Sequence, residues 1–136
     1  MITKKYVTSL SYDIVNCAIE VHKELGPGLL ESIYEKCLIH ELKLRGYRVI
    51  NQVIVPIIYK GLSMEADIRL DILVEDLVVV ELKAIENILP IHEAILLSYM
   101  KLLEKPQGLL INFHTTNIVK ASIPLVNEYF KMLPDE

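Results

Sequence analysis

The stretch RLDILVEDLVVVELK, residues 69–83, decides the fold. Two apolar runs flank a short acidic segment, a pattern that predicts two antiparallel strands joined by a turn. Asp71 lies on the first predicted strand, and alternation puts Glu81 and Lys83 on one face of the second. Two carboxylates and an amine on an apolar hairpin are costly to desolvate. Either a divalent metal ion held by Asp71 and Glu81 compensates that cost, or the three groups form a structural salt-bridge cluster.

The register of this hairpin decides whether the two carboxylates meet. A two-residue loop would put Asp71 and Glu81 on opposite faces of the sheet. A three-residue loop over 75–77, or a bulge with the same offset, pairs Val74 with Val78 and puts Asp71 opposite Glu81. The other face is then wholly apolar, formed by Ile68, Leu70, Ile72, Val74, Val78, Val80 and Leu82. Because a slip of one residue would mix the two sets, burial of the apolar face favours the three-residue loop.

The composition predicts a single domain covering residues 1–136, with a substantial core. Apolar residues make up 52% of the chain, which predicts a large core or a buried partner surface. No apolar run reaches the ~18 residues that span a bilayer. The N-terminus lacks the apolar segment of a signal peptide, so we expect a cytoplasmic location. The formal charge of −4 excludes a general basic field for nucleic acid, so such contact has to rest on local basic clusters or bound metal.

Periodicity along the chain predicts an α/β fold with a mixed sheet flanked by helices. The predicted elements, in chain order, are helices over about 7–25 and 29–45, strands over 47–59 and across the 65–84 hairpin, a helix from Pro90 to Lys105, strands over 108–113 and 117–123, and a helix that starts at Pro124.

The chain resembles the PD-(D/E)XK nuclease superfamily. That superfamily has a restriction endonuclease-like αβββαβ core, and its signature is an Asp followed on the next strand by (Glu/Asp)-x-Lys. Asp71 and the segment Glu81-Leu82-Lys83 match that signature. More narrowly, the chain resembles the small bacterial GxxExxY proteins, whose motif stands here as GLLESIY, residues 28–34. The resemblance covers about residues 12–123.

The resemblance implies a metal-dependent nuclease that hydrolyses phosphodiester bonds in nucleic acid, with DNA as the expected partner. Its catalytic residues would be Asp71, Glu81, Lys83 and Glu31. Asp71, Glu81, Glu31 and the backbone carbonyl of Leu82 would bind Mg²⁺ or Mn²⁺, cations that prefer hard oxygen ligands. The metal would lower the pKa of a bound water and stabilise phosphate charge, while Lys83 would hold or deprotonate that water.

Three further residues are candidate substrate contacts. Arg69, expected opposite Lys83, either contacts phosphate or pairs with a surface acid. Tyr34 follows Glu31 by one turn and is expected to pack, with its hydroxyl directed at the site. His22 matches a position that is often histidine in the GxxExxY proteins, and a capped or solvated histidine is the alternative. For Glu31, placement in the first turn of a helix is also a sufficient explanation, because the helix dipole favours a carboxylate there.

One departure from the family pattern leaves a second function open. Related proteins often carry a glutamine on the helix after the ExK strand, in a pattern such as EAQLLxY, and residues 93–99 here read EAILLSY. Ile95 therefore replaces the amide. This replacement, the acidic net charge and the high apolar content favour the alternative of a catalytically inactive nuclease-fold binding or assembly module. The apolar surplus also predicts a homodimer, and no membrane partner is expected.

Overall fold

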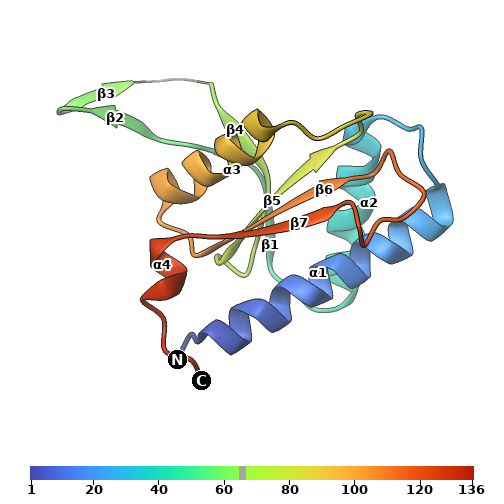
Figure 1. Cartoon of the computed structure of the whole chain (residues 1–136), viewed down its shortest axis with the longest axis horizontal. Helices are drawn as coiled ribbons and strands as arrows, with labels where there is room; N and C mark the ends of the chain where they lie inside the picture. The colour runs from blue at the N-terminus through green and yellow to red at the C-terminus, as the bar shows by residue number, and fades with distance from the viewer. Residues whose placement is uncertain (65–66) are drawn as a thin grey trace.

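The computed structural model describes residues 1–64 and 67–136. A mixed five-stranded sheet packs against helices, consistent with a restriction endonuclease-like core (Figure 1). The helices are α1 (Lys4–Leu25), α2 (Glu31–Leu44), α3 (Pro90–Leu103) and α4 (Glu128–Lys131). The strands are β1 (Val49–Ile54), β2 (Ile57–Tyr59), β3 (Leu62–Met64), β4 (Arg69–Val74), β5 (Val78–Lys83), β6 (Gln107–Asn112) and β7 (Ser122–Val126). In the described part of the chain, no helix combines the length and apolar character needed to cross a membrane.

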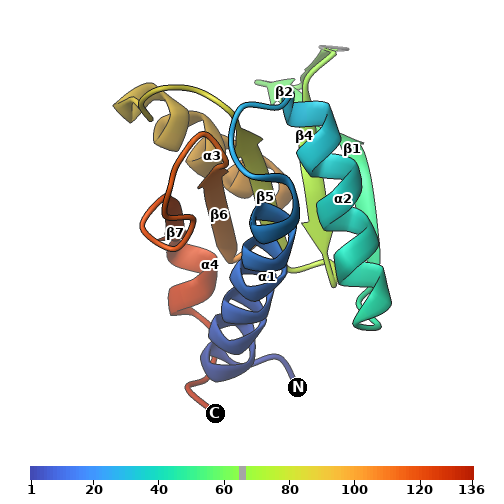
Figure 2. The same ribbon diagram turned by 90° about the vertical axis from the view of Figure 1, so that its right-hand side faces the viewer.

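The five strands of the main sheet lie in the order β1-β4-β5-β6-β7. β5 and β6 are parallel neighbours connected through α3, and the other neighbouring pairs are antiparallel. All six residues of β6 and five of the six in β5 are buried, as expected for parallel strands covered on both faces. Figure 2 shows α1 in front of the sheet and α3 behind it.

Two groups of buried apolar side chains fill the two faces of the sheet. The α1/α2 core includes Ile14, Leu38 and Val80, and the α3 core includes Val79 and Leu96. The consecutive residues Val79 and Val80 of β5 belong to different cores, as strand alternation requires. β5 is therefore fixed from both sides, and so is the segment at its end that carries the predicted site residues.

The loop over residues 26–30 sets where α2 begins. Gly26 ends α1 with a φ of 67° and donates its backbone N–H to the carbonyl of His22. Gly28 has a φ of 99°, so this loop uses two backbone conformations that glycine adopts at little cost. α2 then starts at Glu31, whose carboxylate lies in the first turn, where the helix dipole favours it.

The register of the β4–β5 hairpin is the predicted one. Val74 pairs with Val78 across a turn over residues 75–77. The amide of Leu77 donates to the carbonyl of Val74 and closes this turn. The result confirms the three-residue loop and excludes the two-residue alternative.

The prediction of one wholly apolar hairpin face is wrong, because the alternation of β4 is interrupted at Asp71. Ile72 belongs to the α1/α2 core, whereas Leu70 belongs to the α3 core. In the neighbouring strand β1, Gln52 lies opposite Asp71 and has a φ of 52°. A left-handed residue inside a strand breaks the regular pleat. β1 shows the same change along its length. Val49 packs against the α1/α2 core, whereas Val53 packs against the α3 core.

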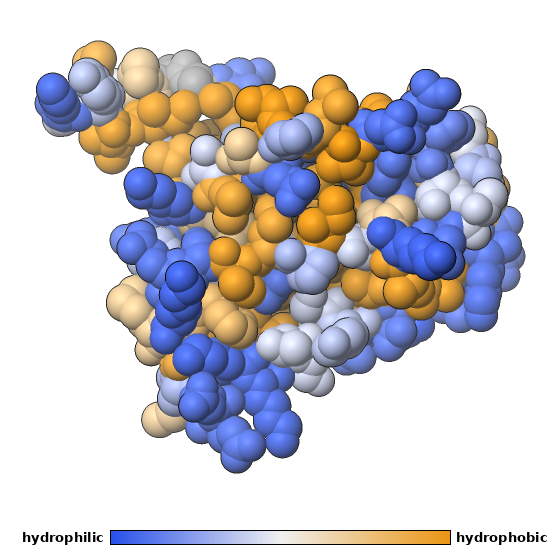
Figure 3. Space-filling view, in the orientation of Figure 1, coloured by the Kyte–Doolittle hydropathy of each residue, from blue (hydrophilic) through white to orange (hydrophobic). Residues whose placement is uncertain are grey.

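β2 and β3 form a separate hairpin that projects from the main sheet (Figure 1). The predicted continuous strand over 47–59 is therefore wrong: β1 ends at Ile54, and Pro56, which lacks a backbone N–H, follows in the connection to β2. Exposed apolar side chains cover the hairpin, among them Ile58 and Leu62. Figure 3 shows hydrophobic residues gathered over the hairpin and the neighbouring part of this face.

The C-terminal prediction is also wrong in its boundaries. β7 spans Ser122–Val126, so Pro124 lies inside a strand rather than at the start of a helix. β7 is an edge strand, where a missing backbone N–H is tolerated. The helix begins after Asn127, whose side chain accepts hydrogen bonds from the backbone amides of Tyr129 and Phe130.

Candidate active site

The carboxylates of Asp71 and Glu81 each accept a hydrogen bond from the backbone of the opposite strand, just beyond the last strand pair of the hairpin. The backbone N–H of Asp71 donates to Glu81 Oε1 at 2.9 Å. The backbone N–H of Leu82 donates to Asp71 Oδ2 at 2.8 Å. Ile72 and Val80 form the final strand pair before these contacts. The two carboxylates thus meet at one end of the hairpin, and each bond uses one of the two oxygens of its carboxylate.

Burial disfavours the ionised form of both carboxyl groups. Glu81 is only 8% exposed, and Asp71 is half-buried. Burial and the negative charge of Asp71 raise the pKa of Glu81 to about 8, although the Asp71 amide and Lys83 oppose the shift. Burial also raises the pKa of Asp71, against the Leu82 amide and the Lys83 ammonium. Two desolvated acids therefore share this site with a single nearby amine.

The end of β5, which carries Lys83, is fixed against β6. The backbone carbonyl of Lys83 accepts a hydrogen bond from the Phe113 amide at 2.8 Å. The buried side chain of Asn112 then holds the chain that follows β5: its Nδ2 donates to the Ile85 carbonyl at 2.8 Å, and its Oδ1 accepts the Ile85 amide at 3.1 Å. Asn112 was not among the predicted site residues.

Helix α2 directs two acids toward this hairpin, one turn apart. The charge of the exposed Glu31 contributes to the raised pKa of Glu81. Glu35 is half-buried, and its pKa is raised by burial first and by the charge of Asp71 second. The GxxExxY motif, residues 28–34, includes Glu31 and ends before Glu35. The i,i+4 spacing from Glu31 was the signal that could have identified Glu35, because residues four apart share a helix face.

The donor atoms at this site fit a hard divalent cation. Asp71 and Glu81 offer carboxylate oxygens, the ligands that Mg²⁺ and Mn²⁺ prefer. Burial raises the pKa of both acids, and a bound divalent ion would favour their ionised forms. Within residues 1–64 and 67–136, however, no three His, Cys, Asp or Glu side chains come close enough together to hold a metal. The structure therefore brings Asp71 and Glu81 together and does not bring Glu31 into a three-ligand group with them.

Tyr34 holds the loop between α1 and α2, so the expected direction of its hydroxyl toward the site is wrong. The side chain is fully buried, and its ring stacks on Phe113 with centroids 4.4 Å apart. The hydroxyl donates to the Gly26 carbonyl at 2.6 Å and accepts the Leu29 amide at 3.1 Å. Both partners belong to the loop that precedes Glu31.

Replacing Tyr34 with phenylalanine should lower stability without changing metal affinity. Loss of the hydroxyl leaves the Gly26 carbonyl and the Leu29 amide without this partner, which costs about 1–2 kcal/mol in the free energy of unfolding. Urea denaturation measures this loss, and Tyr12→Phe, at an exposed tyrosine of α1, is the matched control. A variant with unchanged stability and weaker Mn²⁺ binding would instead place the hydroxyl at the site.

The other two predicted substrate contacts, His22 and Arg69, interact with loop atoms. His22 Nε2 lies 2.8 Å from the carbonyl oxygen of Thr115. Arg69 Nε lies 2.9 Å from Asp67 Oδ1, and both of these side chains are exposed. Arg69 thus pairs with a surface acid in this structure. Such exposed ion pairs contribute little to the free energy of unfolding.

The charges of the two acids also act on Tyr99. It lies on α3 and is half-buried, and its pKa is raised by burial and by the charges of Glu81 and Asp71. It follows Ile95 by one helical turn, so the helix that lacks the family glutamine still presents a polar group. The tyrosine in the EAILLSY segment was the sequence signal for it.

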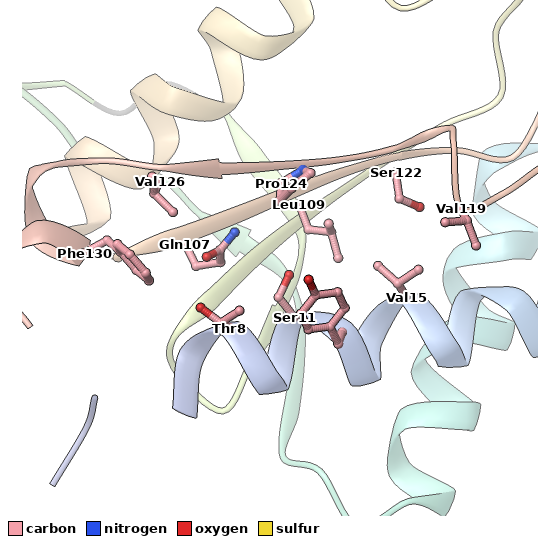
Figure 4. Close-up of a pocket in the computed structure, with 11 residues that line it drawn as sticks. Thr8, Ser11, Val15, Gln107, Leu109, Val119, Ser122, Pro124, Val126 and Phe130 are labelled. Atoms are coloured by element: carbon pink, nitrogen blue, oxygen red, sulfur yellow. The ribbon is translucent and has the colours of Figure 1, made fainter. Parts of the chain in front are cut away.

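A pocket of about 420 Å³ lies elsewhere, between α1 and the strands β6 and β7 (Figure 4). Val15, Leu109 and Phe130 are among its lining residues, and none of the lining side chains in the described part of the chain is charged. None of the predicted site residues borders this pocket. A phosphodiester is anionic and requires charge compensation in its site, so the carboxylates and Lys83 are the better candidate for phosphodiester chemistry.

Comparisons with known proteins identify the family of this chain. No curated protein and no solved structure matches the chain. A sequence model of the PD-(D/E)XK nuclease superfamily matches residues 8–123. The matched segment contains Glu31, Asp71, Glu81 and Lys83, together with most of the sheet that holds them. Because this match spans most of the chain, the chain belongs to the PD-(D/E)XK nuclease superfamily.

Proposed function

We propose that this protein is a GxxExxY-type, metal-dependent nuclease that hydrolyses phosphodiester bonds in nucleic acid, with DNA as its substrate. The main support is a pair of carboxylates, those of the half-buried Asp71 and the buried Glu81, which bond across the hairpin near Lys83 in a chain of this superfamily. Fold membership alone does not specify an activity, so the proposal rests on these side chains.

Asp71 and Glu81 would hold Mg²⁺ or Mn²⁺, together with the backbone carbonyl of Leu82, and Glu31 would act from farther out on α2. When bound, the cation would offset charge on the scissile phosphate and lower the pKa of the attacking water. The low exposure of Glu81 excludes bulk water from its side of the site, which strengthens every charge interaction there.

Lys83 has two possible tasks in this reaction. As an ammonium it would offset the negative charge that grows on the phosphate. As a neutral amine its Nζ would accept the proton of the attacking water. Attachment of its backbone to Phe113 fixes the end of β5 in either case.

Replacing Asp71 with alanine tests the proposal. The purified protein is incubated with duplex, single-stranded and branched DNA in the presence of Mn²⁺, and Mn²⁺ binding is measured by calorimetry. We expect cleavage and Mn²⁺ binding by the unmodified protein, and loss of cleavage with at least tenfold weaker binding in Asp71→Ala. The exposed acid Asp135, which pairs with Lys4 near the chain ends, provides the control variant Asp135→Ala.

Failure of the unmodified protein to cleave any of these substrates or to bind Mn²⁺ would contradict the nuclease and support a binding or assembly module. Two observations favour that alternative: the absence of a three-ligand metal group among the described residues, and Ile95 on α3. The cytoplasmic location and the homodimer stay predictions. The exposed apolar side chains of the β2–β3 hairpin are of the kind that partner surfaces use, and sedimentation of the purified protein measures the oligomeric state.

A further inference from the structure

Gln52 has an unfavourable backbone conformation inside a strand. Its φ of 52° lies in the left-handed region, which costs a non-glycine residue on the order of 1 kcal/mol. The residues on either side of it keep their pairs with β4. The irregularity is therefore confined to the one position of β1 that lies opposite Asp71.

The side chain of Gln52 connects β1 to α2. Its Nε2 donates a hydrogen bond to Glu35 Oε1 at 2.8 Å. Gln52 also lies opposite Asp71 in the register of β1 and β4, between the pairs Asn51–Ile72 and Val53–Leu70. Gln52 thus links an acid of α2 to the strand position that faces Asp71.

The hydrogen bond from Gln52 holds the Glu35 carboxylate at β1, at the position opposite Asp71. The Glu35 side chain is half-buried, and its pKa is raised first by burial and then by the charge of Asp71, which acts more strongly than that of Glu31. Without the bond to Gln52, the flexible Glu35 side chain would turn away from a second negative charge toward solvent, since like charges at close range repel. The bond to Gln52 instead keeps the Glu35 carboxylate at β1.

We propose that Gln52 is a positioning residue that holds the Glu35 carboxylate beside Asp71, where Glu35 contacts the bound cation through a water. This inference rests on the proposed function. A water-mediated contact agrees with the absence of a three-ligand group among the described residues.

Replacing Gln52 with glycine separates a structural role from a positioning role. Glycine adopts a left-handed φ at little cost, so the metal-free variant should unfold at the same or a higher urea concentration. Mn²⁺ affinity, measured by calorimetry at pH 8, should nevertheless fall about tenfold, as for other groups that orient metal ligands. Glu35→Gln should lose affinity by a similar factor, and the double variant should lose little more, because both changes remove one contact.

Two controls make the outcomes distinguishable. Glu41→Gln removes another acid of α2, one that pairs with Arg45, and should leave Mn²⁺ affinity unchanged. If Asp71→Ala loses affinity while Gln52→Gly and Glu35→Gln bind Mn²⁺ like the unmodified protein, the role of Gln52 is overturned and the proposed function stands. If the unmodified protein does not bind Mn²⁺, or Asp71→Ala binds it equally well, the proposed function and this inference both fail.

Discussion

Replacing Glu81 with glutamine should stabilise the metal-free protein at high pH and abolish metal binding. Burial and the charge of Asp71 raise the pKa of Glu81 from 4.5 to about 8 in the folded protein. Between these two values the folded state keeps a proton that the unfolded state has lost, so the free energy of unfolding falls as pH rises. Across the whole window the loss in the free energy of unfolding is on the order of 5 kcal/mol. Glutamine carries no charge and still offers an oxygen to the Asp71 amide, so the variant avoids this loss.

Urea denaturation at pH 5, 7 and 9 in the presence of a chelator measures the effect. The two proteins should have similar stability at pH 5, where Glu81 is protonated, and Glu81→Gln should be more stable by about 2–4 kcal/mol at pH 9. Glu128→Gln, at an exposed position in α4, controls for a change of net charge. Parallel pH profiles for Glu81→Gln and the unmodified protein would show that Glu81 is already ionised at pH 5, which would remove the desolvation argument.

Addition of Mn²⁺ should reverse the order of stability. A cation that binds only the folded state stabilises it, and it competes with the proton on Glu81. Stabilisation of the unmodified protein by Mn²⁺ should therefore increase from pH 7 to pH 9. Glu81→Gln should show no such increase, because its amide cannot become a carboxylate ligand.

The hairpin could be predicted from sequence because its determinants are local. Burial of one set of alternating side chains and a turn of three residues suffice to select the pairing of Val74 with Val78. That register then brings Asp71 and Glu81 to the same end of the hairpin. Helix α2 was predictable for the same reason, since its apolar spacing and the preceding glycines lie within one segment.

Features that depend on two distant segments could not be predicted in this way. The interruption of β4 at Asp71 goes together with the left-handed φ of Gln52 in another strand, and no local pattern marks a glutamine for that conformation. The burial of the Tyr34 hydroxyl depends likewise on the path of the loop at Gly26. Pro124 was assigned to a helix start because proline favours that position, whereas its place in β7 follows from β7 being the edge of the sheet.

Replacing Lys83 with methionine should separate catalysis from metal binding. Methionine keeps most of the apolar stem of lysine and removes its charge. Cleavage should fall by roughly 10²- to 10⁴-fold, the range for loss of a group that transfers a proton or offsets transition-state charge. Mn²⁺ affinity at pH 9 should hold or rise, because the ammonium that lowers the pKa of both acids also repels a cation. Loss of cleavage without loss of metal affinity distinguishes Lys83 from Asp71, whose removal should weaken both cleavage and Mn²⁺ binding.

Lys83→Arg then decides which task the amine performs. Arginine keeps a positive charge near the phosphate but does not lose its proton in proteins. If Lys83 offsets phosphate charge, Lys83→Arg should retain a substantial part of the activity that Lys83→Met loses. If Lys83 accepts the proton of the attacking water, the two variants should be equally inactive. Cleavage by Lys83→Met at the rate of the unmodified protein would contradict both tasks and leave Lys83 with a structural charge only, beside two carboxylates whose pKa values it lowers.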